Sequence, residues 1–301
     1  MGHDVDAMVK GILNLNKPSG ITSRAVVDRV ARLLPRINKV GHAGTLDPLA
    51  SGVLILCVGS ATRLIESVQR MPKVYRTVIR LGARSDTLDA EGRVAVVENP
   101  SVPSELEVRQ ALAGQVGEIL QRPPEYSALK IKGQRAYDLA RAGRVVDLEP
   151  RIVRIDRADL VSYRWPHLEL EIACGGGTYI RSIARDLGEA LACGGLVAAL
   201  VRTRIGPFAL DSSADPTTLT SSSLAANLRP AVDAVPDLPT ITLNESQARA
   251  IAQGRVVDAT NLALDSLPHG EIALLDADGR LIAIGQGDSS HRTIHPRKVL
   301  M

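Results

Sequence analysis

The sequence predicts an α+β protein built of two unequal units. Its hydrophobic fraction of 45% and charged fraction of 23% are typical of a globular protein, and its 301 residues suffice for about two domains. Strand-like and helix-like segments alternate irregularly along the chain, which favours a mixed α+β architecture over a regular βαβ array. A stretch rich in Ser, Thr, Ala and Pro towards the C-terminal end predicts where the two units meet.

The first sixty residues predict a strand, a helix and a second strand. Residues 11–15 are mostly apolar and predict the first strand. Thr22 or Ser23 can cap the helix that follows, whose apolar positions recur with helical spacing at Val26, Val27, Val30, Leu33 and Leu34. Residues 41–52 contain too many Gly and Pro residues for a regular element, so they predict an ordered loop before the apolar strand 53–58.

The middle of the chain predicts further helices and strands. Strands are recognised by side chains that alternate between two faces, and helices by apolar residues three and four positions apart. The expected elements are a helix at 60–70, a strand at 73–81, a helix at 104–113, a strand at 168–173 and a helix at 180–191.

The C-terminal part predicts a small, mainly β unit that follows a linker. Residues 212–239 show little periodicity and form the linker, so the domains are expected at 1–236 and 237–301. The expected elements of the small unit are a strand at 241–243, a capping box of Asn244 and Gln247 that opens a helix ending at Gly254, and a hairpin over 273–284 with its turn at Asp278-Gly279.

Several classes of protein are excluded by what the sequence lacks. The cysteines Cys57, Cys174 and Cys193 are odd in number and have no metal-ligand spacing, so a disulfide framework and a zinc knuckle are not expected. His291 and His295 lack the Glu of a zinc-protease motif and a third ligand, so no metal site is predicted. No phosphate-binding or dinucleotide-binding glycine motif occurs. Without a secretory leader or a long apolar run, the protein is expected in the cytoplasm.

The net charge of +3 is unevenly distributed. Residues 1–236 carry 30 basic and 25 acidic side chains, whereas residues 237–301 carry 6 and 8. Between residues 130 and 154 seven basic side chains face only three acidic ones. This excess is typical of a solvated surface, but it also marks the first place to expect a polyanion. The basic residues are Lys130, Lys132, Arg135, Arg141, Arg144, Arg151 and Arg154.

Asp47 lies in the glycine-rich loop, where it precedes Pro48. An Asp-Pro pair alone is typical of a turn. It occurs here, however, together with five further motifs, and the six segments span residues 16 to 183. They are Asn16-Lys-Pro-Ser-Gly-Ile-Thr-Ser23, Gly41-His-Ala-Gly-Thr-Leu-Asp-Pro-Leu-Ala-Ser-Gly52, Lys73-Val-Tyr-Arg76, Leu81-Gly-Ala-Arg-Ser-Asp-Thr87, Tyr126-Ser-Ala-Leu-Lys130 and Gly177-Thr-Tyr-Ile-Arg-Ser-Ile183. In these segments the sequence resembles the TruB family of tRNA pseudouridine synthases.

The resemblance implies both a fold and an activity. The implied fold is a mixed, mainly antiparallel sheet in the catalytic core, an inserted basic RNA-clamping segment at about residues 125–155, and a small C-terminal domain resembling the PUA fold. The implied reaction is the isomerisation of uridine to pseudouridine at position 55, in the T-loop of tRNA, by base flipping and without a cofactor.

The resemblance also implies the catalytic residues. Asp47 corresponds to the catalytic nucleophile, which suits an ionised carboxylate that attacks a carbon atom without a metal. Arg181 is expected to face Asp47 and to hold it ionised. Tyr75 is expected to lie against the target uracil, where its hydroxyl can take part in moving the proton from C5. Without the resemblance, Tyr75 is a core-facing strand residue and Arg181 belongs to a structural ion pair.

Four further residues correspond to substrate-binding positions. His42 is expected to occupy the space that the flipped nucleotide leaves. Tyr179 offers a hydroxyl and Leu200 an apolar wall to the pocket. Lys17 is expected to support the Asp47 loop.

The implied partner is the T-arm of tRNA. The seven basic residues listed above become candidates for contacts with the RNA backbone. No membrane, obligate protein partner or guide RNA is expected, and the protein is expected to be a monomer. The C-terminal unit carries more acidic than basic side chains, whereas an RNA-binding domain is expected to be basic.

Three alternatives remain at this point. A guide-RNA-dependent synthase shares the Asp loop, but the Lys-rich tails often seen in its eukaryotic forms are absent. A non-catalytic RNA-binding or RNA-folding protein would keep the fold without needing Asp47. A glycosidase is disfavoured because it needs two carboxylates, and only one lies in the motif.

Overall fold

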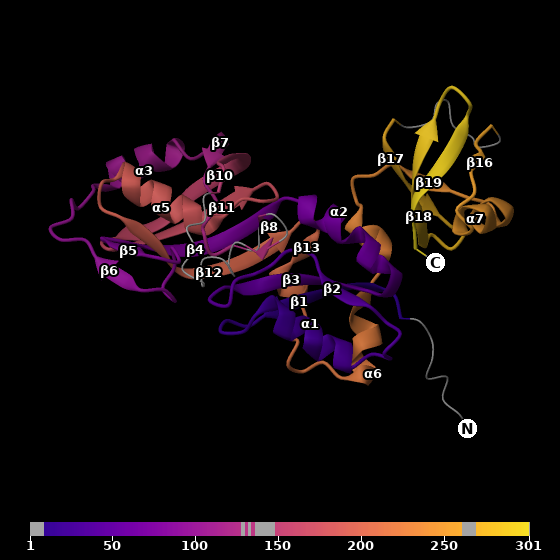
Figure 1. Cartoon of the computed structure of the whole chain (residues 1–301), viewed down its shortest axis with the longest axis horizontal. Coiled ribbons are helices and arrows are strands. Elements are labelled where there is room, and N and C mark those ends of the chain that lie inside the picture. Colours follow the sequence, from indigo (N-terminus) through magenta and orange to yellow (C-terminus); the bar gives the residue numbers. More distant parts are fainter. Residues whose placement is uncertain (1–8, 128–129, 132–133, 136–147, 261–268, 301) are drawn as a thin grey trace.

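The computed structural model describes residues 9–127, 130–131, 134–135, 148–260 and 269–300. It contains one large sheet with helices packed against it and a smaller sheet at the C-terminal end (Figure 1). The strand order of the large sheet is β14-β1-β3-β12-β4-β11-β10-β7, with β2 beside β3 and β13 beside β12.

Ten strands build the large sheet. Their bounds are β1 Gly11–Lys17, β2 Val40–His42, β3 Ser51–Val58, β4 Lys73–Leu81, β7 Gly117–Gln121, β10 Arg151–Arg164, β11 His167–Cys174, β12 Gly195–Ile205, β13 Phe208–Ala209 and β14 Leu228–Arg229. Two short hairpins lie outside it, made of β5 Ala83–Ser85 with β6 Val94–Val96 and of β8 Lys130–Ile131 with β9 Gln134–Arg135.

The helices pack against different parts of the two sheets. The α-helices are α1 Ser23–Arg32, α2 Ile65–Arg70, α3 Glu105–Ala113, α5 Ile180–Ala190, α6 Ser221–Leu224 and α7 Glu245–Ala252. The 3₁₀ segments are η1 Gly59–Leu64, η2 Leu210–Ser212, η3 Ala225–Asn227 and η4 Ala231–Ala234. In Figure 1, α3 and α5 lie together over one end of the sheet, and α1 lies beside β1 and β2 at the other end.

The topology confirms a mixed, mainly antiparallel sheet. Among the described neighbours in the large sheet, β12 and β3 are parallel and the other pairs are antiparallel. The parallel pair places β12 between the strand that follows the Asp47 loop and strand β4, which carries Tyr75. Residues that are distant in sequence therefore meet at the centre of the sheet.

Several local predictions are confirmed by hydrogen bonds or by the burial pattern. The side chain of Thr22 accepts from the backbone of Ala25 and caps α1. The capping box of Asn244 and Gln247 opens α7. Strand β4 alternates between buried and less buried residues along its length, as a strand with one buried face does.

Two predictions about chain organisation are wrong in detail. Residues 60–70 do not form one helix, because the chain first winds as the 3₁₀ segment η1 and only then as α2. Residues 212–239 are not a linker. They run back across the large sheet, where β14 pairs with β1, and they bury Leu219 and Leu224 against α1 and β3. Low periodicity here reflects a segment that packs through isolated apolar residues.

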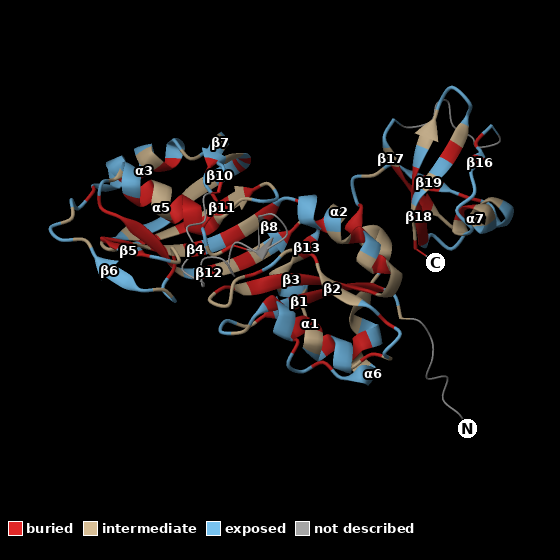
Figure 2. Ribbon diagram, in the orientation of Figure 1, coloured by how far each residue is buried: buried red, intermediate tan, exposed pale blue. Residues whose placement is uncertain are grey.

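Aliphatic side chains make up the core, as the scarcity of aromatic residues predicts. One buried cluster joins β4, β11 and β12 to α3 and α5, and another joins β1 and β3 to α1. Figure 2 shows these strands as mostly buried, with exposed residues on the outer faces of the helices.

The C-terminal unit contains the predicted helix and hairpin. Its sheet has the order β15-β17-β18-β19-β16, with bounds β15 Thr240–Thr242, β16 Val257–Asp258, β17 Glu271–Leu275, β18 Leu281–Asp288 and β19 Thr293–Val299. It packs against η1 and α2, where Arg63 donates to the carbonyl of Val299 and Lys298 pairs with Glu66. Its likeness to the PUA fold stays a prediction.

The basic segment is only partly described. Lys130 and Arg135 lie in β8 and β9, whereas Lys132, Arg141 and Arg144 lie outside the described residues. Arg151 and Arg154, assigned to the end of the insertion, instead belong to β10 of the large sheet. Within the described chain, no helix is long and apolar enough to cross a membrane.

Candidate active site

The loop that carries Asp47 joins β2 to β3 and is held by side chains from α1 and β1. Ser23 donates its hydroxyl to the carbonyl of Leu46 and accepts from the Leu46 amide, at 2.9 and 2.8 Å. The loop returns to β3 through Gly52, whose φ is +103°. A Cβ at that position would lie 2.3 Å from the carbonyl oxygen of Arg202, so only glycine fits.

Lys17 lies beneath this loop and is fully buried. Its ammonium group donates to the carbonyls of Pro18, Ile21 and Pro48, at 2.9, 2.7 and 3.3 Å. The Pro48 contact ties the lysine to the residue after Asp47. Burial lowers the pKa of Lys17 from 10.5 to about 8, although the nearby Asp47 carboxylate opposes that shift.

Activity should therefore decline as the pH rises past about 8. Deprotonation leaves the Lys17 amine with two hydrogens for three carbonyls, which loosens the loop. The free energy of unfolding should not fall in the same pH range. Between about pH 8 and 10.5, Lys17 loses its proton in the folded protein but keeps it in the unfolded chain, so stability rises with pH. Rates and urea unfolding on both sides of pH 8 test this.

Lys73 provides the control for that prediction, because burial lowers its pKa to about 8 as well. The decline should persist in Lys73→Met. Its loss in this variant would move the assignment from Lys17 to Lys73.

Arg181 faces Asp47 from the first turn of α5. Its Nε lies 2.9 Å from Oδ2 of Asp47, and its Nη1 lies 3.5 Å from Oδ2 of Asp89. Nη1 and Nη2 also donate to the carbonyls of Thr87 and Tyr126, both at 2.9 Å. The guanidinium is buried and fixed from several directions, so it can orient the Asp47 carboxylate as the sequence predicts.

Two opposing effects set the acidity of Asp47. Burial raises the pKa of its carboxyl above the ordinary value, and the Arg181 guanidinium is the strongest group that lowers it again. The carboxylate of Asp89 raises the pKa of Asp47 further, and the Arg202 guanidinium lowers it. The side chain of Asp47 is still 33% exposed, so one face of the carboxylate is open to a substrate.

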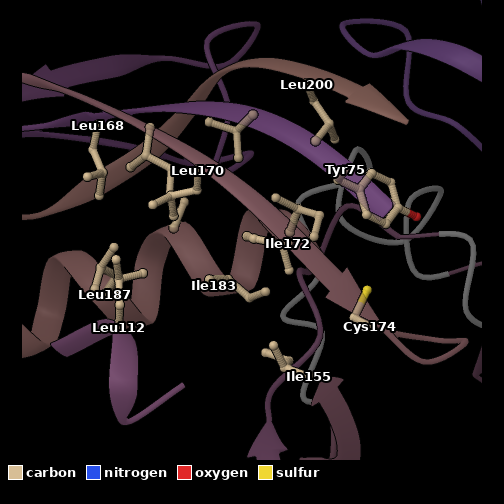
Figure 3. Close-up of a cluster of buried hydrophobic side chains, with 14 of the residues drawn as sticks. Tyr75, Leu112, Ile155, Leu168, Leu170, Ile172, Cys174, Ile183, Leu187 and Leu200 are labelled. Atoms are coloured by element: carbon tan, nitrogen blue, oxygen red, sulfur yellow. The ribbon is translucent and has the colours of Figure 1, made fainter. Parts of the chain in front are cut away.

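A cavity of about 420 Å³ opens in front of Asp47. Tyr75, Tyr179 and Leu200 line it, together with Asp47 and Arg181. Figure 3 shows Tyr75 at the edge of the buried aliphatic cluster, with its hydroxyl directed away from that cluster. The volume is within the range of small-molecule sites and has room for a nucleoside.

The structure thus gathers five of the seven residues that the resemblance implies. His42 and Lys17 are not among the residues that line the cavity. His42 ends β2 and pairs with Leu56, while Lys17 supports the loop from below. Arg151 was expected only at the RNA backbone, yet it lines the cavity with its guanidinium over the ring of Tyr179, 5.1 Å from the centroid.

Two residues that support the site, Gln121 and Arg202, were not predicted from the sequence. Gln121 holds Tyr179 by accepting from its amide at 2.9 Å and donating to its carbonyl at 3.2 Å. Arg202 is fully buried beside the Asp47 loop. A signal for Arg202 was present, because it lies two positions after Leu200 and residues with that spacing share one face of a strand. Gln121 carried no comparable signal.

The arrangement suits attack by a carboxylate. Among the described residues that line the cavity, Asp47 provides the one carboxylate, and the Arg181 guanidinium faces it. Tyr75 adds an aromatic hydroxyl to the lining and Leu200 an aliphatic wall. Such a carboxylate can form a covalent bond to an electrophilic carbon atom of a bound nucleoside.

Comparisons with known proteins identify the family of this chain. Residues 32–180 match the N-terminal domain of TruB family pseudouridylate synthases, and residues 181–233 match a tRNA pseudouridylate synthase B C-terminal domain. A protein of Syntrophobacter fumaroxidans named tRNA pseudouridine synthase B is 42% identical, covering 91% of this chain and 92% of that protein. A protein of the same name from Stutzerimonas stutzeri is 41% identical, covering 97% of this chain and 96% of that protein.

A solved structure shows the same fold. A chain of the crystal structure of a Cbf5-Nop10-Gar1 complex aligns with a TM-score of 0.74 and 24% identity, covering 97% of this chain and 85% of that chain. This likeness supports the architecture alone. The family models and the two relatives together show that this chain belongs to the TruB family of pseudouridylate synthases.

Proposed function

We propose that this protein is an isomerase that converts uridine to pseudouridine in tRNA, at position 55 of the T-loop, with Asp47 as the nucleophile and without a cofactor. The main support for this proposal is the position of the Asp47 carboxylate at one wall of the cavity, where its Oδ2 lies 2.9 Å from Nε of the buried Arg181. Membership of the family and the names of its relatives support the choice of tRNA and of the reaction.

The reaction begins when the target uridine turns out of the T-loop into the cavity. Asp47 forms a bond to the flipped nucleotide, at C6 of the base or C1′ of the ribose, and the N1–C1′ bond breaks. The base rotates and its C5 bonds to C1′, which displaces Asp47 if the carboxylate is bound to C1′. The proton on C5 is then removed, its bonding electrons restore the C5–C6 double bond and expel Asp47 if the carboxylate is bound to C6, and N1 takes up a proton.

Side chains around Asp47 have separate tasks in this scheme. Arg181 orients the carboxylate and opposes the rise of its pKa. Tyr75 lines the cavity, and its proposed task is to lie with its ring against the base and to take part, through its hydroxyl, in the proton transfer from C5. Leu200 forms an apolar wall. His42 is assigned to the space left by the flipped nucleotide.

Mapping of pseudouridine at single-nucleotide resolution tests the proposal. The substrate is an unmodified tRNA transcript, compared with a transcript that carries cytidine at position 55. We expect pseudouridine at position 55 of the first transcript and none in the second, with no cofactor added. Binding of both without any pseudouridine would favour a protein that only binds or folds RNA.

The basic segment should supply the electrostatic part of tRNA binding. Replacing Arg141 and Arg144 by Ala removes two charges, so the slope of log Kd against log salt should become shallower by about 1.5 units. Filter binding over a range of salt concentrations measures this. An unchanged slope would remove these two residues from the RNA interface.

A further inference from the structure

Arg202 is a buried cation at the junction of three strands. It lies in β12, where it is opposite Tyr75 of β4 on one side and opposite Gly52 of β3 on the other. Its exposed fraction is 2%. The register of β12 against β4 shifts between Arg202 and Arg204, and such a bulge re-aims neighbouring side chains.

The guanidinium of Arg202 binds the start of β3 and the Asp47 loop together. Nε donates to the carbonyl of Val53 at 2.7 Å. Nη2 and Nη1 donate to the carbonyls of Gly44 and Thr45, at 3.3 and 3.4 Å. One planar side chain therefore fixes the loop on both sides of Asp47, a geometry that a lysine with a single ammonium group cannot reproduce.

Arg202 also lies opposite the other candidate catalytic group, Tyr75, on the neighbouring strand β4. Burial raises the pKa of the Tyr75 hydroxyl, and the charge of the Arg202 guanidinium opposes that rise. Cys174 and Asp47 lie near this hydroxyl as well, and both raise its pKa further. Both Arg202 and Tyr75 line the cavity. Arg202 thus holds the Asp47 loop by hydrogen bonds and lies across from Tyr75 at the same cavity.

We propose that Arg202 is a positioning residue that holds the Asp47 loop and the Tyr75 hydroxyl in one fixed relation across the cavity. This inference deepens the proposed function and rests on it. An arginine with a purely structural role would contribute to the stability of the fold and not to the placement of Tyr75. Substitution of such a residue should lower the stability without slowing the chemical step in the folded protein.

The test uses two variants of the full chain, because they remove different properties. Arg202→Lys keeps the charge and loses the planar fork, whereas Arg202→Gln keeps amide donors and loses the charge. The matched control is Arg229→Lys. Arg229 is a partly buried arginine that pairs with Asp233 at 2.8 Å and is not among the residues that line the cavity.

Single-turnover pseudouridine formation and tRNA binding are measured for each variant. A loop displaced by about 1 Å is expected to slow the chemical step by about 10²-fold in both Arg202 variants, with the Kd for tRNA nearly unchanged. Arg229→Lys should keep the wild-type rate. An Arg202 variant that folds and reacts at the wild-type rate would overturn the inference.

A double-mutant cycle with Tyr75→Phe separates positioning from stability. If Arg202 acts partly through Tyr75, Arg202→Gln should slow the reaction less in the Tyr75→Phe background than in the wild type. Effects that multiply in full would overturn the link to Tyr75. Unfolding of both Arg202 variants at the assay temperature would assign the residue to fold stability alone.

The outcomes also separate this inference from the proposed function. A wild-type protein that makes no pseudouridine in tRNA overturns the proposed function, and the inference falls with it. An active wild type with equally active Arg202 variants overturns the inference alone.

Discussion

Asp47→Asn is expected to lower the rate of pseudouridine formation by about 10⁴-fold or more, as the loss of a member of a catalytic group does in other enzymes. The substitution keeps the size and shape of the side chain. It removes the negative charge and with it the nucleophile that forms the covalent bond. Because Asp47 is one residue of a cavity wall, binding of tRNA to the rest of the surface should be largely kept.

Asp186→Asn is the matched control for this change. Asp186 is also a partly buried aspartate paired with an arginine, Arg185, at 2.7 Å, but it does not line the cavity. Its substitution should leave the rate within a few-fold of wild type. Single-turnover assays with enzyme in excess, beside filter binding, provide both measurements. Turnover by Asp47→Asn close to the wild-type rate would remove Asp47 as the nucleophile.

The sequence predicted the position of Asp47 well because the signal is local. Glycines and prolines exclude regular structure around it, and the structure shows a loop between His42 of β2 and Ser51 of β3. The support from Lys17 was also expected, and its contact with the Pro48 carbonyl places it there. The role of each residue in the reaction stays a prediction.

Contacts between distant segments could not be read from local patterns. Arg202 reaches Val53 and Thr45 only because β12 lies parallel to β3, a pairing that periodicity does not encode. Gln121 meets Tyr179 for a similar reason, since β7 is the last strand of the large sheet and ends beside the start of α5. Such sites need the topology first.

The failed linker prediction has the same physical origin. Residues 212–239 lack periodicity, yet they add a short strand beside β1 and bury Leu219 and Leu224. A segment that packs through a few apolar side chains on an existing sheet needs neither helical nor strand periodicity of its own. Its composition therefore resembles that of a linker.

Arg181→Gln should slow the reaction by about 10²- to 10³-fold, the usual effect of removing one preorganised electrostatic contact. It should also change the pH dependence. Arg181 is the main group that lowers the pKa of Asp47, so its removal leaves burial and Asp89 to raise that pKa further. Since the carboxylate is the reactive form, the acid limb of the pH-rate profile should move to higher pH.

Two comparisons show whether this shift comes from the charge of Arg181. Arg181→Lys keeps the charge but cannot reach the carbonyls of Thr87 and Tyr126 together, so it should be slow with a smaller shift of the acid limb. Arg185→Lys, one turn further along α5, should change neither. An acid limb that stays in place in Arg181→Gln would mean that Arg181 orients Asp47 without controlling its ionisation.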